Sequence, residues 1–136
     1  MTLRERNYRN LKVWTAAHAL ALRVYRVTDS LPDTERFGLV TQLRRATASV
    51  AANLAEGSGR SSAQVFANYV DIAYASATEL DYHLLLAHDL GYLDAVQHES
   101  LSRHASEVQR MLAALRRSLG GRTAVRPTRR AAVPFR

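Results

Sequence analysis

The sequence predicts an all-α protein that folds as an antiparallel up-down-up-down four-helix bundle. Apolar residues recur at alternating spacings of three and four through four long segments, as they do along one face of a bundled helix. The connections between these segments are short and contain proline or glycine, residues that end helices. Since short connections favour antiparallel neighbours, the four helices are expected to close around one core.

The first helix is expected over residues 11–30. Its expected core positions are Trp14, Ala17, Ala21, Val24, Thr28 and Leu31. Pro32 ends this helix, because proline lacks an amide hydrogen and disfavours helical geometry in the residue before it. Asp33 or Thr34 is the predicted cap of the second helix, and Glu35 would lie near the positive end of its dipole.

The second helix is expected to end near Glu56, where Gly57 and Gly59 would supply a turn with positive φ. Ser61 and Gln64 lie three residues apart and fit a capping box that opens the third helix. The expected core positions of the third helix are Phe66, Tyr69, Ala73, Ser76, Leu80, His83, Ala87 and Leu90.

The fourth helix follows Gly91 and is expected to end at Gly120 and Gly121. Its expected core positions are Leu101, Ala105, Val108, Leu112, Leu115 and Leu119. A length of 136 residues suits one domain with a single core. The predicted organisation is an N-terminal extension over residues 1–10, a bundle over residues 11–121 and a basic, disordered tail over residues 122–136.

The formal charge of +7 is unevenly distributed along the chain. Five of the 19 basic residues and none of the 12 acidic residues lie in the tail, so the rest of the chain is nearly neutral. The basic residues of the tail are Arg122, Arg126, Arg129, Arg130 and Arg136. The tail could contact phosphates or acidic proteins by unspecific attraction, or serve only as a solubilising terminus.

The composition also restricts the class of protein. Because the chain has no cysteine, disulfides and thiolate metal sites are excluded. The N-terminus lacks the apolar run of a secretory signal, and no uncharged stretch approaches the roughly 18 residues that span a bilayer. We therefore expect a soluble, cytoplasmic protein without membrane contact.

One stripe of the second helix carries many polar groups. At about 100° per residue, five polar side chains fall within about 80° of one another. They are Gln42, Arg45, Ser49, Asn53 and Glu56. An apolar face and a face of alanines occupy the other sides, which favours a helix contacted from several directions and so an assembly. Arg45 and Glu56 lie three turns apart, so each needs a partner on another helix or another subunit.

Two interpretations of the basic residues remain open. In the structural one, which we favour for the polar stripe, its side chains form a packed network. In the functional one, Arg44, Arg45 and Arg60 are accessible and neutralise phosphates, and Arg116 and Arg117 of the fourth helix extend the surface. Arg44 and Arg60 lie outside the favoured network and are therefore freer to bind. The nucleic-acid-binding candidates are Arg44, Arg60, Arg116 and Arg117.

No catalytic residues, metal site or cofactor is predicted. Di-iron bundles repeat a Glu-x-x-His pair, whereas Glu79 is followed three residues later by Tyr82. Residues 57–60 contain two glycines, but no strand precedes them and no Gly-Lys-Ser/Thr ending follows. His83 falls in the expected core with Glu79 one turn earlier, which favours a structural hydrogen bond.

Several motifs together resemble one known family. They are Leu11-Lys12-Val13-Trp14, Leu31-Pro32 with Glu35, QLRRA over 42–46, SVAANLAEGSGR over 49–60, AYASATEL over 73–80 and DLGYL over 89–93. This set resembles the four-helix bundle protein family that includes the 23S ribosomal RNA intervening-sequence proteins and the accessory variability proteins of diversity-generating retroelements. The resemblance covers residues 11–119 and departs at Leu31, where the family usually has an aromatic residue.

The resemblance implies a cyclic homo-oligomer, characteristically a pentamer, whose contacts use two different faces of each protomer. One branch of the family implies nucleic-acid binding and a reverse transcriptase partner, and the other implies only a reading frame within a ribosomal RNA gene. We therefore expect a non-enzymatic homo-oligomer that binds RNA or DNA mainly through phosphates, as a reverse-transcriptase accessory factor in the first branch. The alternative is a protein scaffold or adaptor without physiological nucleic-acid binding, which the near-neutral body favours.

Overall fold

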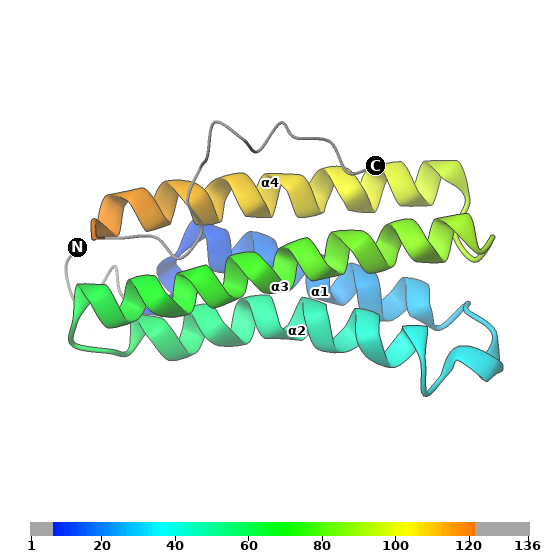
Figure 1. Cartoon of the computed structure of the whole chain (residues 1–136), viewed down its shortest axis with the longest axis horizontal. Helices are drawn as coiled ribbons and strands as arrows, with labels where there is room; N and C mark the ends of the chain where they lie inside the picture. Colours follow the sequence, from blue (N-terminus) through cyan, green and yellow to red (C-terminus); the bar gives the residue numbers. More distant parts are fainter. Residues whose placement is uncertain (1–6, 122–136) are drawn as a thin grey trace, which may run out of the picture.

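The structure, a computed structural model, describes residues 7–121 and contains four long helices that lie side by side (Figure 1). They are α1 (Lys12–Thr28), α2 (Leu39–Ser58), α3 (Ala63–Asp89) and α4 (Ala95–Leu119), and 3-10 helices at Tyr8–Asn10 and Asp33–Glu35 precede α1 and α2. Each helix contacts its neighbours in sequence, and α1 also contacts α4. This arrangement confirms the predicted up-down-up-down four-helix bundle.

The structural description excludes both ends of the chain. Residues 1–6 of the predicted N-terminal extension and the predicted basic tail, residues 122–136, lie outside the described residues. Within residues 7–121, no helix combines the length and the apolar character that crossing a membrane requires.

The core side of α3 differs from the prediction at every other position. Its buried residues are Phe66, Ala67, Val70, Ala73, Ala77, Leu80, Leu84 and Ala87. Tyr69, Ser76 and His83 are only partly buried, and Leu90 is exposed. After Phe66, the predicted core positions follow at spacings of three, then four, and so on. Apart from Ala67, the observed core positions follow at spacings of four, then three. Both patterns are typical of a bundled helix, so spacing alone does not distinguish them.

The start of α2 also differs from the prediction. The predicted caps, Asp33 and Thr34, form a 3-10 helix with Glu35, and α2 begins at Leu39. The N-cap position is Gly38, which has no side chain, and Oε1 of Glu35 accepts a hydrogen bond from the Leu39 amide at 3.2 Å. Its Oε2 accepts one from the Tyr92 hydroxyl at 2.9 Å, and this bond to a carboxylate raises the pKa of Tyr92. Glu35 therefore joins the α1–α2 connection to the α3–α4 turn.

Gly57 belongs to the last turn of α2 rather than to a turn with positive φ. Among the described residues, positive φ occurs at three other glycines only, so the prediction for Gly57 and Gly59 was wrong. A Cβ on Gly57 would lie 2.5 Å from the Cβ of Tyr69 and 3.0 Å from Cδ1 of Phe66. Glycine is required here because the backbones of α2 and α3 approach closely.

The N-terminus of α3 uses a different cap from the predicted one. Ser62, rather than Ser61, is the N-cap, and its Oγ accepts a hydrogen bond from the Val65 amide at 3.3 Å. Gln64 does not complete a capping box, because the third helical position after Ser62 is Val65, and the Gln64 amide donates to Asn68 instead. The cap therefore lies one residue beyond the predicted position.

A buried ion pair joins α4 to α3. Nε of Arg116 donates to Oδ1 of Asp71 at 2.9 Å, and Nη1 donates to the carbonyl oxygen of Gly120. The side chains of Arg116 and Asp71 are 6% and 13% exposed. The prediction that Arg116 adds to an accessible surface was therefore wrong: this arginine holds the end of the bundle together.

Gly57→Ala is expected to lower the free energy of unfolding by about 1–3 kcal/mol, because the new Cβ must displace Tyr69 from a packed position. Gly59→Ala is the matched control, since its Cβ would meet only a carbonyl oxygen at 3.7 Å and φ is −81°. The control is expected to be neutral or stabilising by about 0.4–1 kcal/mol. Urea denaturation followed by circular dichroism measures both, and equal stabilities would contradict the close approach of the two helices.

Arg116→Ala is expected to lower the free energy of unfolding by about 3–5 kcal/mol, because it removes one partner of a buried ion pair. Arg117→Ala, at the adjacent exposed position, is expected to change it by less than about 0.5 kcal/mol. Guanidinium denaturation of the two variants provides the comparison. If both variants lost the same free energy of unfolding, the buried ion pair of Arg116 would contribute no more to stability than the exposed Arg117, which would contradict this prediction.

Candidate nucleic-acid interface

The polar stripe of α2 lies along its seam with α3. Oγ of Ser49 and Oγ of Ser76 are 2.8 Å apart, and Nδ2 of Asn53 donates to the carbonyl oxygen and Oγ of Ser49 at 2.8 and 3.0 Å. Seven residues make about two helical turns, so the antiparallel register places Gln42 level with His83. The stripe and the α2-facing edge of α3 therefore form the two sides of one polar seam.

The charged ends of the stripe are paired within the protomer. Nη2 of Arg45 donates to Oε1 of Gln42 at 2.8 Å, and Glu56 forms an ion pair with Arg60 one turn later. Arg45 and Glu56 are both exposed. Within the described residues, the partners of both side chains therefore lie in or just after α2 rather than on another helix, and a partner on another subunit stays a prediction.

Arg60 makes a second contact that reaches α3. Its Nη2 donates to the Tyr69 hydroxyl at 3.1 Å, and its guanidinium lies 5.4 Å from the centroid of the Tyr69 ring. Tyr69 and Glu56 both raise the pKa of Arg60. The side chain is 45% exposed and borders a cavity of about 570 Å³, which Arg9 and Tyr8 also line. Arg60 is thus accessible but already carries a carboxylate partner.

The Arg44 side chain forms hydrogen bonds with the C-terminal end of α1. Its Nε donates to Oγ1 of Thr28 at 2.9 Å, and its Nη2 donates to Oδ1 of Asp29 at 2.9 Å and to the carbonyl oxygen of Tyr25 at 3.3 Å. The guanidinium also lies 4.9 Å from the centroid of the Tyr25 ring. These contacts fasten α2 to α1, contrary to the expectation that Arg44 is free to bind a ligand.

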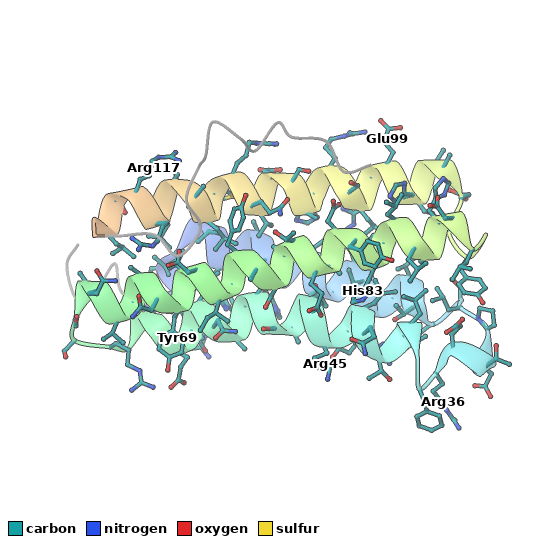
Figure 2. All side chains as sticks on the ribbon, viewed as in Figure 1. Arg36, Arg45, Tyr69, His83, Glu99 and Arg117 are labelled. Atoms are coloured by element: carbon teal, nitrogen blue, oxygen red, sulfur yellow. The ribbon has the colours of Figure 1, made fainter. Side chains whose placement is uncertain are left out.

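Arg117 occupies a different environment from the other three candidates. It is exposed on α4, and Figure 2 shows Arg117 and Arg45 projecting from opposite sides of the bundle. Arg110 and Arg103 lie seven and fourteen residues earlier, and both are exposed as well. The candidates predicted from the sequence do not include these two residues, although the seven-residue arginine repeat is visible there.

Basic residues are concentrated on the adjacent helices α1 and α4. α1 contains Lys12, Arg23 and Arg26 and no acidic residue, while α4 contains four arginines and two glutamates. In contrast, α3 contains four acidic residues and no lysine or arginine. Because α1 packs against α4 and α2 packs against α3, the bundle has a basic side and an opposite side without excess basic charge.

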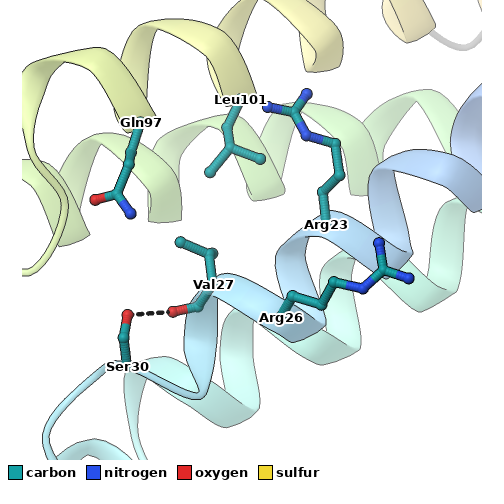
Figure 3. Close-up of a pocket in the computed structure, with 6 residues that line it drawn as sticks. All are labelled: Arg23, Arg26, Val27, Ser30, Gln97 and Leu101. Atoms are coloured by element: carbon teal, nitrogen blue, oxygen red, sulfur yellow. Dashed lines mark hydrogen bonds between the residues drawn. The ribbon is translucent and has the colours of Figure 1, made fainter.

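A groove of about 420 Å³ lies between α1 and α4 on the basic side (Figure 3). Its lining residues are Arg23, Arg26, Val27, Ser30, Gln97 and Leu101. Nη1 of Arg23 lies 2.9 Å from Nδ1 of His104, and Nη2 donates to Oγ of Ser100 at 2.6 Å. Nε2 of His104 lies 3.1 Å from the carbonyl oxygen of Ala16, so it carries the ring proton and Nδ1 accepts from Arg23. The Arg23 guanidinium is therefore held at a defined position.

The histidines do not form a metal-binding set in the part of the chain that the structure describes. Residues 7–121 contain no group of three or more His, Asp or Glu side chains that could hold a metal ion. Nδ1 of His83 is buried and has no hydrogen-bond partner there, so the predicted bond to Glu79 is absent. His88 and His98 stack with their ring centroids 4.6 Å apart, and Nδ1 of His88 also contacts the Leu93 carbonyl oxygen at 2.9 Å.

Comparison with known proteins agrees with this architecture. Residues 9–114 match the family described as 23S rRNA-intervening sequence protein. The chain also resembles the crystal structure of a protein of unknown function from the S23 ribosomal protein family of Bacteroides thetaiotaomicron, with 25% identity and a TM-score of 0.72. That match covers 77% of this chain and 95% of the other. None of the curated proteins matches. The chain belongs to the 23S rRNA-intervening sequence protein family, as its motifs indicated.

Proposed function

We propose that this protein is a non-enzymatic homo-oligomer that binds RNA or DNA through phosphate contacts on α1 and α4. The observation that carries the proposal is the separation of charge between the two sides of the bundle. Lysine and arginine neutralise phosphates and release counterions, whatever the base sequence. The exposed cations on this side are Lys12, Arg26, Arg103, Arg110 and Arg117.

The arginine repeat on α4 suits a phosphate backbone. Residues seven apart lie about 10 Å from one another along a helix, so Arg103, Arg110 and Arg117 present three guanidinium groups in a row. Arg103 pairs with Glu99 at 2.9 Å, but their side chains are 70% and 75% exposed. An ion pair in such a position contributes little to stability, so a phosphate can replace the glutamate at small cost.

Self-association is assigned to the side formed by α2 and α3. Ile72 and Tyr82 of α3 are 50% and 57% exposed, and α2 presents the exposed small residues Ala48 and Ala52. Exposed apolar side chains can contribute to a protein contact surface. In the proposed assembly, the α2 surface of one protomer meets the α3 surface of the next, which is the head-to-tail contact that a closed ring needs.

The names of the related proteins connect the family to ribosomal RNA without stating an activity. The matched family is named for an intervening sequence of 23S rRNA, and the similar solved structure is of a protein of unknown function from the S23 ribosomal protein family. The pentameric state and the reverse transcriptase partner remain predictions of the family resemblance. A protein adaptor remains the alternative outcome of the binding test.

Arg110→Ala is expected to weaken nucleic-acid binding and to lower the salt slope by about 1 for each protomer that contacts the ligand. Arg36→Ala is the matched control, because it removes the same charge from an exposed position in the α1–α2 connection, which is assigned neither to binding nor to assembly. Fluorescence anisotropy of a labelled duplex, titrated between low and physiological salt, measures both quantities. Absence of binding at low salt, or a flat salt response, would favour the protein adaptor.

Ala52→Arg is expected to reduce the assembly to smaller species, because it adds a long cation to the α2 surface without touching the core. Ala19→Arg makes the same change at an exposed position of α1 and is expected to leave the mass unchanged. Light scattering at micromolar concentration measures the mass of each variant. A single-chain mass for the unaltered protein would refute assembly, and an unchanged oligomer with Ala52→Arg would exclude α2 from the interface.

A further inference from the structure

The apolar and polar residues that line the α1–α4 groove lie in separate zones. Figure 3 shows three zones: Arg23 and Arg26 at one end, Val27 and Leu101 in the middle, and Ser30 and Gln97 at the other end. The volume of about 420 Å³ falls within the range of roughly 300–1,000 Å³ that is typical of small-molecule sites. The groove is therefore large enough for a flat group of ligand size.

The end with Gln97 and Ser30 offers both a donor and an acceptor. Oε1 of Gln97 accepts the Asp94 amide at 3.1 Å in the capping box of α4, which orients the side-chain amide. Its Nε2 makes no hydrogen bond within residues 7–121 and remains a donor. Oγ of Ser30 donates to the Val27 carbonyl oxygen at 2.7 Å and can therefore still accept a hydrogen bond.

The opposite end of the groove suits an anion. Arg23 is held against α4 by Ser100 and His104, so its guanidinium loses little freedom when a ligand binds. Arg26 is exposed and makes no ion pair within the described part of the chain. Two guanidinium groups at one end of an apolar groove form a surface that a phosphate can occupy.

We propose that this groove holds one unstacked nucleotide of a single-stranded RNA or DNA segment. Its base lies against Val27 and Leu101, the polar edge of the base meets Gln97 and Ser30, and its phosphate contacts Arg26. A duplex keeps its bases stacked and paired, so only a strand with unpaired nucleotides can supply this ligand. The inference rests on the proposed function and narrows its ligand to single strands.

The test uses Gln97→Glu in the otherwise unaltered full chain. Glutamate retains the oxygen that accepts the Asp94 amide, so the capping box survives, but the donor to the base is lost and a negative charge is added. Gln109→Glu is the matched control, because it adds the same charge on α4 at a residue that faces Thr78 of α3. Thermal melting of both variants checks that the bundle remains folded.

Fluorescence anisotropy compares an unstructured 20-nucleotide strand with the duplex of the same sequence at one salt concentration. The strand is expected to bind at least about tenfold more tightly than the duplex, because only the strand can place an unpaired base against Val27 and Leu101. Gln97→Glu is expected to weaken strand binding about tenfold and duplex binding less than about twofold. Gln109→Glu is expected to change either affinity less than about twofold.

The other outcomes separate this inference from the proposed function. Equal binding of strand and duplex, unaffected by Gln97→Glu, would overturn the nucleotide site and leave phosphate binding intact. Failure of both ligands to bind would overturn the proposed function and the nucleotide site together. Adenosine monophosphate that competes as strongly as the strand, at equal concentration, would reassign the groove to a free nucleotide.

Discussion

The close approach of α2 and α3 at Gly57 is the constraint on which the rest of the structure depends. Because the glycine admits Tyr69 next to the α2 backbone, that edge of α3 faces the polar stripe of α2 rather than the core. Ser76 then meets Ser49 two turns further along, and the next turns of α3 keep the same orientation. Ser49 and Asn53 of the polar stripe form hydrogen bonds in this seam, and Glu56 pairs with Arg60, whereas most of the exposed cations lie on α1 and α4.

The fold class followed from the sequence, because an apolar repeat in each of four segments has to be buried somewhere and short connections leave few arrangements. The sequence did not predict which face of α3 is turned toward the core. The two possible sets of core positions that start at Phe66 differ only in whether the spacing of three or of four residues comes first. The contact with Gly57 decides between them, and it joins different helices. The start of α2 was missed for a similar reason: the Glu35 side chain accepts from the first amide of the helix and from Tyr92, 57 positions later in the chain.

The candidate site was predicted less well than the fold, because residue type does not reveal the environment of an arginine. Arg116 and Arg117 are adjacent in sequence, yet one faces Asp71 inside the bundle and the other faces solvent. Arg44 was chosen for its expected accessibility, but the end of α1 occupies its guanidinium. The uneven charge of the helices could have been counted from the sequence. The basic side of the bundle could not be predicted from this count, because it depends on the packing of α1 against α4 in the folded protein.

The two sides of the bundle have connected roles in the proposed function. Assembly through α2 and α3 would place α1 and α4 of every protomer on the outside, so the arginine row of α4 would recur around the ring. Contacts that are weak in one protomer then act together on one strand, because each later contact forms at a high effective concentration. The charge imbalance of a single protomer is modest, so the proposed binding depends on the proposed assembly. In that proposal, the seam at Gly57 would support nucleic-acid binding without contacting the ligand.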